Sequence, residues 1–120
     1  MTNRKYVLVD KVRDKRIYDE IIVDCYDEIE QMMGWQCYLD ETLKFPFLAK
    51  CIKKQGVSPL EIGEVVEVIS VGENCENDML VNIHWSGRKF EVPLSQLQPM
   101  NATKKVKQVF DDWRYWSQYL

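Results

Sequence analysis

Two adjacent pairs of acids are the residues of this chain best suited to chemistry. Asp40 and Glu41 lie in the string YLDETL, and Asp111 and Asp112 lie in FDDWRYW, so each pair is set among aromatic side chains. Adjacent carboxylates repel one another, and in a partly dry site a bound cation relieves that cost. A hard cation such as Ca²⁺ takes about six to eight oxygen ligands, which clustered carboxylates help to supply. The two pairs therefore predict a calcium site, provided that the fold brings them together.

A simpler interpretation of the same acids, as solvent-exposed residues of helices, competes with this prediction. On composition alone, acids on helices are more typical of a solvated helix face than of a metal site. The chain also contains no Asp-x-Asp-x-Asp-Gly run ending in Glu, so it has no EF-hand loop. Any calcium site must therefore be assembled from segments that lie far apart in the sequence.

Other chemistry finds little support. His84 is the only histidine, and it has no Cys or His at ligand spacing. The motifs GxGxxG, GxxxxGK[ST], GxSxG and HExxH are all missing from the sequence. Glu28 or Glu73 acting with Asp112 as an acid and base pair is conceivable, but nothing marks a pocket. We therefore predict that the protein is not an enzyme.

The cysteines do not suggest a zinc or redox site. They lie singly, without any CxxC pair, at Cys25, Cys37, Cys51 and Cys75. Their even number would permit two disulfides in an exported chain, but no export signal supports that compartment. We expect them to be reduced and mostly to pack in the interior.

Charge is distributed unevenly along the chain. The net charge is only −3, yet residues 19–41 hold eight acids and residues 55–87 hold six, with no Lys or Arg in either stretch. Such local acidity argues against binding DNA or RNA. No apolar run approaches the roughly 20 residues that span a bilayer, so we expect a cytoplasmic protein without a membrane partner.

Helices are predicted in the part of the chain that must position the first pair of acids. Apolar residues between Ile17 and Met33 recur at spacings typical of a helix face. Asp27 and Glu30 match a capping arrangement, in which a new helix begins after Asp27. The sequence therefore leaves open whether this region forms one helix or two. A short helix over 35–43 should follow, because Pro46 ends any helix. The helical region is predicted over residues 14–43.

A compact sheet should follow over residues 44–99. Strands are predicted at 45–52, 64–71, 79–85 and 88–94, with Ser86-Gly87 forming a tight hairpin between the last two. The loop at 72–78 should end the second of them. Thr103 then caps a final helix over 103–118. We predict a single α+β domain over residues 1–120, in which a small SH3-like β-barrel or a strongly twisted antiparallel sheet is flanked by the terminal helices.

Large aromatic side chains should join the two helical regions. Trp35 belongs to the first region, and Trp113 and Trp116 belong to the last helix. Their packing would bring the two carboxylate pairs near each other.

Several separated strings of this chain resemble one known family. The segment MGWQCYLDETLKFPFLAKCI is followed in order by SPLEIGEVVEVI, MLVNIHW, VPLSQLQP and DDWRYW. Together they are similar to the cyanobacterial-type (CcbP-like) calcium-binding protein family over about residues 20–118. The resemblance implies a compact protein that binds Ca²⁺ through surface carboxylates without an EF-hand, and that acts in the family as an intracellular Ca²⁺-sequestering protein affecting cell differentiation.

The resemblance also maps onto individual residues. The acidic pair after YL falls on Asp40 and Glu41, where the family usually has Glu before Asp, and the acids before the WxYW element fall on Asp111 and Asp112. Glu28, which lies in the acidic run before the matching segment, is a further candidate ligand. The leading hypothesis is thus intracellular calcium buffering. The alternative is an SH3-like protein-interaction module that presents aromatic residues to a peptide without metal; a protein partner is unknown.

Overall fold

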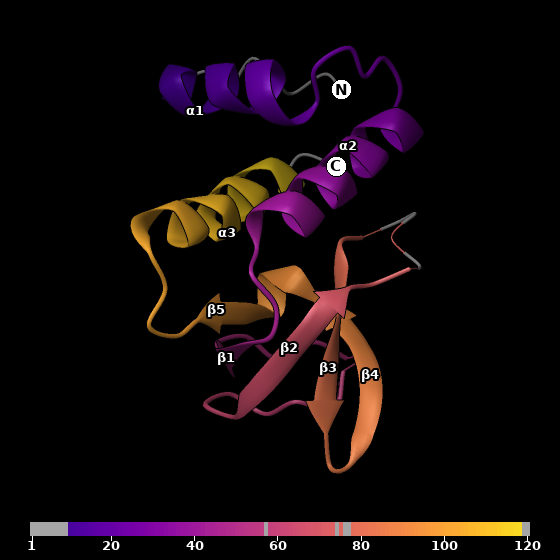
Figure 1. The fold of residues 1–120 in the computed structure, drawn as a ribbon, viewed down its shortest axis with the longest axis vertical. Coiled ribbons are helices and arrows are strands. Elements are labelled where there is room, and N and C mark those ends of the chain that lie inside the picture. The colour runs from indigo at the N-terminus through magenta and orange to yellow at the C-terminus, as the bar shows by residue number, and fades with distance from the viewer. Residues whose placement is uncertain (1–9, 57, 74, 76–77, 119–120) are drawn as a thin grey trace.

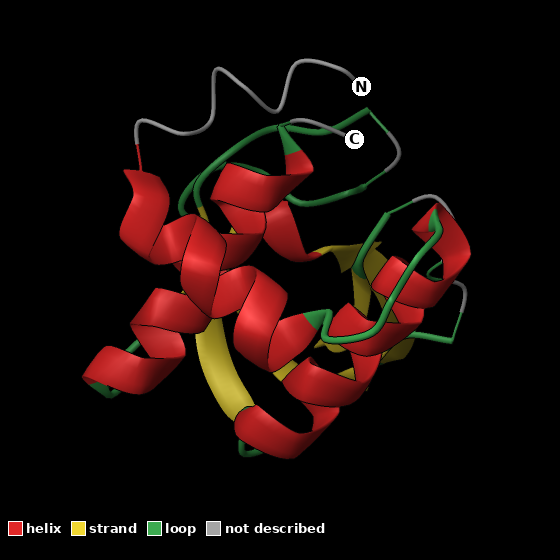
Figure 2. Ribbon diagram, turned by 90° about the horizontal axis from the view of Figure 1, so that it is seen from above, coloured by secondary structure: helices red, strands yellow, loops and turns green. Residues whose placement is uncertain are grey.

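A computed structural model describes residues 10–56, 58–73, 75 and 78–118. The helices are α1 (Lys11–Arg16), the π-helix η2 (Ile17–Ile21), α2 (Glu28–Thr42), the 3₁₀ turn η3 (Leu94–Gln96) and α3 (Lys104–Ser117). The strands are β1 (Phe47–Cys51), β2 (Val65–Val71), β3 (Leu80–Trp85), β4 (Arg88–Pro93) and β5 (Leu97–Pro99). Figure 1 shows α2 and α3 lying between α1 and the sheet, and Figure 2 shows the helices gathered on one side of the strands.

Capping decides how the first helical region is divided. Asp10 accepts a hydrogen bond from the backbone N–H of Arg13 at 3.0 Å and begins α1, which runs on into η2. Asp27 begins α2 with a full capping box, in which the side chains of Asp27 and Glu30 accept from each other's backbone N–H groups. The region therefore contains two separate helical segments, and the capping motif in the sequence located the second one correctly.

The predicted short helix over 35–43 is not a separate element. It is the C-terminal part of α2, which runs through Gly34 without a break. A Cβ atom on Gly34 would lie 2.9 Å from the backbone oxygen of Ile21. The glycine is therefore needed for close packing of α2 against η2, and it does not end a helix.

The sheet has five antiparallel strands in the order β4-β3-β2-β1-β5. The hairpin at Ser86-Gly87 is confirmed, with both residues at positive φ (51° and 76°) and Trp85 opposite Arg88. These angles suit a tight turn whose twist matches the flanking strands. The α+β class and the antiparallel sheet are thus confirmed.

The prediction of a closed barrel is wrong. Strands β4 and β5 are the two ends of the sheet in the described part of the chain, and they do not pair with each other. The turn η3 redirects the chain directly after β4, so that β5 has three residues and pairs only with β1. The sheet consequently stays open and is covered by helices on one side (Figure 2).

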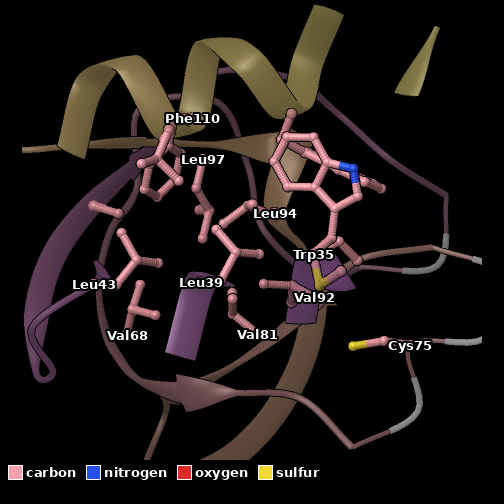
Figure 3. Close-up of a cluster of buried hydrophobic side chains, with 14 of the residues drawn as sticks. Trp35, Leu39, Leu43, Val68, Cys75, Val81, Val92, Leu94, Leu97 and Phe110 are labelled. Carbon is pink, nitrogen blue, oxygen red and sulfur yellow. The ribbon is translucent and has the colours of Figure 1, made fainter. Parts of the chain in front are cut away.

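Tryptophans join the helices to each other above the sheet. Trp35 of α2 and Trp113 of α3 are fully buried and meet edge to face, with ring centroids 5.1 Å apart. Phe110 of α3 contacts Phe47 of β1 in the same manner at 6.0 Å. The predicted packing of the two helical regions through aromatic residues is confirmed. Figure 3 shows the side chains around Trp35 pointing toward one another, with Cys75 apart at the edge.

The cysteines are all free thiols. Cys51 and Cys75 are buried, whereas Cys37 is exposed on α2. No helix in the described ranges has the length and apolar character needed to cross a membrane.

Candidate metal centre

Asp112 is a buried carboxylate that is already paired with arginine. Its side chain is 1% exposed and accepts two hydrogen bonds from the Arg16 guanidinium, at 2.9 Å to Nε and 2.7 Å to Nη2. Arg13 lies 3.4 Å from the same carboxylate. Hydrogen bonding to Asp112 raises the pKa of Arg16, so this arginine stays charged. Both carboxylate oxygens of Asp112 thus serve to hold α3 against α1.

Asp111 faces away from Asp112 and is exposed. Its side chain pairs with Arg114 one turn along α3, at 3.0 Å. Its backbone carbonyl accepts a hydrogen bond from Nη1 of Arg13 at 3.2 Å. Because successive helical residues point in different directions, this adjacent pair does not act as one chelating unit.

Asp40 lies in a different part of the molecule, on the exposed surface of α2. It lines a hollow of about 330 Å³ between α2 and the residues that follow β2. Gln36 and Glu73 line the same hollow from either side. Glu41 is exposed and does not line it. Asp40 therefore has a second carboxylate in its surroundings, but that carboxylate comes from Glu73 and not from α3.

Glu28 lines a larger neighbouring hollow of about 600 Å³, which shares Gln36 and Glu73 with the first. We call the two together the α2 groove. It is lined from α2 by residues spaced about one turn apart, and from the other side by the last residue of β2 and the residues that follow it. These residues are Glu28, Ile29, Met32, Met33, Gln36, Cys37, Asp40, Val71, Gly72, Glu73 and Cys75.

The α2 groove is acidic. Glu28, Asp40 and Glu73 line it, and no described Lys or Arg does. Among the described residues, however, no three His, Cys, Asp or Glu side chains gather closely enough to hold a metal ion by themselves. The structure thus does not join the five predicted acids into one cluster. Any calcium site in the groove would also need amide or main-chain oxygens.

The β2–β3 side of the groove is fixed in place by hydrogen bonds. The Gln36 side chain donates to the carbonyl of Gly72 at 2.8 Å, and a carboxylate oxygen of Glu91 accepts from the backbone N–H of Glu73 at 2.8 Å. A Cβ atom on Gly72 would lie 2.7 Å from that carboxylate and 2.9 Å from the carbonyl of Leu80. Glycine therefore lets the chain pass close to β3 and β4 at this point, while the Gln36 side chain ties the same residue to α2.

A further acid, Asp78, ends this connection. Its carboxylate accepts from the backbone N–H of Met79 at 2.8 Å. Burial raises the pKa of Asp78, and the hydrogen bond from Met79 partly opposes that rise. Residues 74, 76 and 77 of the predicted loop lie outside the described residues. Asp78 is therefore an acid that bears a desolvation cost when it ionises.

Sequence reasoning did not select Glu73 or Asp78 as ligands. Both fall in the second acidic stretch without Lys or Arg, which was the available signal. The sequence could not show that this stretch returns to the surface of α2, because that contact is made by the hydrogen bond from Gln36 to Gly72, residues 36 positions apart in the chain.

Comparison with known proteins gives the family. A family model described as calcium binding, named for CcbP, matches residues 15–117. The chain belongs to the CcbP calcium-binding family. The predicted family is thus confirmed, and with it calcium as the family's ion. The family description names binding and no reaction. No curated protein sequence matches significantly.

Two solved structures are similar to this CcbP-family protein along most of its length. The crystal structure of Anabaena CcbP is 35% identical, covers 90% of each chain and has a TM-score of 0.78. A second structure, described as a calcium-binding protein in the calcium-binding form, is 33% identical, covers 98% of this chain and 96% of its own, and has a TM-score of 0.80.

Proposed function

We propose that this CcbP-family protein binds Ca²⁺ reversibly in the polar end of the α2 groove. Asp40 and Glu73 would supply carboxylate oxygens there, and Gln36 would supply an amide oxygen. Ca²⁺ accepts such mixed sets of carboxylate, amide, main-chain and water oxygens. Of the acids predicted from the sequence, the proposal keeps Asp40 as the main ligand and Glu28 as a neighbour along the groove. It adds Glu73.

The observation that carries the proposal is that carboxylates from two separate segments line one hollow without any described Lys or Arg beside them. Carboxylates gathered without a basic partner repel one another, and a divalent cation removes that repulsion. By contrast, Asp112 is paired with Arg16 and Asp111 with Arg114. The proposal therefore assigns Asp112 to holding α3 against α1 and Asp111 to an ion pair within α3, and neither to the metal.

The proposed physiological role is intracellular calcium buffering without an EF-hand. The groove lies at the surface, whereas the buried core around Trp35 and Trp113 lies between the helices and the sheet. Loss of the ion would therefore cost little fold stability, and a protein that stays folded can bind and release Ca²⁺ repeatedly. Ca²⁺ binding would stabilise the folded state only by mass action.

Calorimetric titration of Ca²⁺ into the metal-free protein, with Mg²⁺ as a comparison ion, tests this function. We expect saturable heat for the wild type and at least tenfold weaker binding for Asp40→Asn and for Glu73→Gln. The matched controls are Asp111→Asn on α3 and Glu67→Gln on β2, whose carboxylates pair with Arg114 and His84. Both controls should bind as the wild type does.

Two outcomes would contradict the proposal. If the wild type gave no heat, calcium binding by this protein would be ruled out. Loss of binding in Asp111→Asn with unchanged binding in Asp40→Asn would move the site to α3. The alternative of an SH3-like module that presents aromatics gains no support, since the large exposed aromatics among the described residues, Tyr18 and Tyr26, lie in the helical region.

A further inference from the structure

The end of the α2 groove farthest from Asp40 is apolar and open. Ile29 is 72% exposed and Met33 is 58% exposed, one helical turn apart on α2. Met32 forms part of the lining of the same hollow and is buried. Exposed large apolar side chains that line one hollow cost solvation free energy unless a partner covers them, and such patches mark interaction sites.

Acidic side chains flank this apolar surface. Glu28 and Glu73 line the hollow together with Ile29 and Met33. Residues 19–41, which include α2 up to its penultimate residue and the turn before it, contain no Lys or Arg. A partner that covers the surface must therefore carry apolar side chains flanked by positive charge, because a neutral or acidic partner would leave these carboxylates desolvated or repelled.

The dimensions of the surface favour a helix as the partner. The hollow has a volume of about 600 Å³ and lies along α2, with anchors at the one-turn spacing of Ile29 and Met33. A partner helix presents its own apolar side chains at the same spacing of three or four residues. Methionine is unbranched and adapts its shape to different partners, which suits Met33 to such a contact.

We infer that the apolar end of the α2 groove binds a basic amphipathic helix of a partner protein. Ile29 and Met33 contact the apolar face of that helix, and Glu28 and Glu73 pair with its Lys or Arg side chains. This surface works without Ca²⁺, so the inference does not depend on the proposed metal site.

Fluorescence anisotropy in EDTA tests the inference directly. The probe is a labelled peptide of about 15 residues, long enough for a marginal helix, built only from Leu and Lys so that one face is apolar. We expect saturable binding of this peptide and no binding of the same peptide with Glu in place of Lys. The double substitution Ile29→Ala and Met33→Ala should weaken binding at least tenfold, because it removes both anchors and keeps the charges.

Matched exposed positions elsewhere serve as controls. Ile62→Ala and Val12→Ala remove side chains that are 68% and 75% exposed on other parts of the surface. Both should leave the peptide affinity within twofold of the wild type. Glu28→Gln should weaken binding severalfold and make it less sensitive to salt. Together these variants separate the apolar contacts from the charge contacts.

Three results would overturn the inference. The first is absence of saturable binding by the Leu and Lys peptide. The second is an equal loss of affinity in Ile62→Ala, which would indicate nonspecific adhesion. The third is a concentration-dependent dimer in analytical ultracentrifugation that is lost in the double variant, which would make a second copy of this chain the occupant of the surface.

Discussion

The neighbours of a carboxylate decide whether it is free to hold a metal ion. Asp112 is surrounded by helices, and the guanidinium of Arg16 holds both of its oxygens at 2.9 Å and 2.7 Å. Asp40 lies at the surface in a hollow that no described Lys or Arg lines. The two residues have the same chemistry, but the first stabilises a helix contact and the second has oxygens available for a ligand.

Asp112→Asn should therefore destabilise the fold without removing calcium binding. The substitution leaves the charge of Arg16 without its partner at a site where Arg16 is 18% exposed. We expect a loss of roughly 3 kcal/mol in the free energy of unfolding, as for other buried ion pairs broken on one side. Urea denaturation in EDTA measures this loss.

Asp111→Asn is the matched control for that experiment. Its carboxylate is exposed and pairs with Arg114 only across one helical turn, so its removal should change stability by no more than about 0.5 kcal/mol. Equal stability of the two variants would contradict the structural role of Asp112. A loss of calcium heat in a stable Asp112→Asn protein would instead return this residue to the metal site.

Asp78 should make stability depend on pH in the acid range. Burial raises the pKa of this carboxyl above its ordinary value of 3.8, so the folded state binds the proton more tightly than the unfolded chain does. The contribution of Asp78 is therefore most favourable below pH 3.8 and is lost as the pH rises through the raised pKa. At neutral pH, ionised Asp78 costs stability.

Asp78→Asn removes this cost and retains an oxygen that can accept from Met79. In EDTA we expect a higher unfolding midpoint for the variant at neutral pH, and a difference that shrinks toward zero near about pH 3, below the pKa of an unperturbed aspartate. Thermal unfolding across that range measures both. A variant that is less stable at neutral pH would show that ionised Asp78 gains more from its contacts than it loses by burial.

At the scale of elements, local signals in the sequence were sufficient to locate an element boundary where one or two residues fix the backbone. Asp27 with Glu30 began α2, and Ser86-Gly87 closed the β3–β4 hairpin. The separate helix predicted over 35–43 was wrong, because α2 runs through Gly34 without a break and the glycine there serves close packing against η2. Barrel closure was misjudged for a similar reason, since no local pattern reports how few residues remain for β5 after η3.

The candidate site was only partly predictable for a related physical reason. The sequence identified Asp40 and Glu28 as acids on a helix surface. It did not identify Glu73, whose place beside α2 depends on the hydrogen bond from Gln36 to Gly72 and on the one from the Glu73 backbone to Glu91. The surroundings of Glu73 arise only when α2 and the residues after β2 come together in the fold, and the sequence of neither segment shows this alone.

Gly34→Ala should weaken the contact between α2 and η2. Alanine favours a helix by up to about 1 kcal/mol over glycine, but the added Cβ would lie 2.9 Å from the carbonyl of Ile21 and 3.1 Å from Sγ of Cys25. Because backbone must move to relieve the first contact, we expect a net loss of about 1 to 3 kcal/mol, typical of overpacking. Urea denaturation measures the change.

Gly56→Ala provides the control for this substitution. A Cβ there would meet nothing within 4 Å, so stability should be unchanged or slightly higher, as for other unstrained glycine replacements. A Gly34→Ala protein as stable as the wild type would show that the two segments separate at little cost, and that the close packing at this glycine is not required.

At the scale of the whole molecule, the α2 groove couples the proposed calcium site to the proposed docking surface. Glu73 lines both hollows, with Asp40 at one end and Ile29 at the other. A bound Ca²⁺ would cancel negative charge that also attracts a basic helix. By linkage, each ligand must then weaken the other by the same factor.

Saturating Ca²⁺ should therefore weaken binding of the Leu and Lys peptide by about tenfold, corresponding to a coupling free energy of about 1.4 kcal/mol. Anisotropy titrations in EDTA and in Ca²⁺, at matched ionic strength, measure the ratio. At a Ca²⁺ concentration that saturates the wild type but leaves the weaker Asp40→Asn site mostly empty, this variant should bind the peptide equally in both conditions, because it retains the apolar anchors. Tighter peptide binding in Ca²⁺ would mean that the ion orders the docking surface instead of neutralising it, and would exclude competition through Glu73.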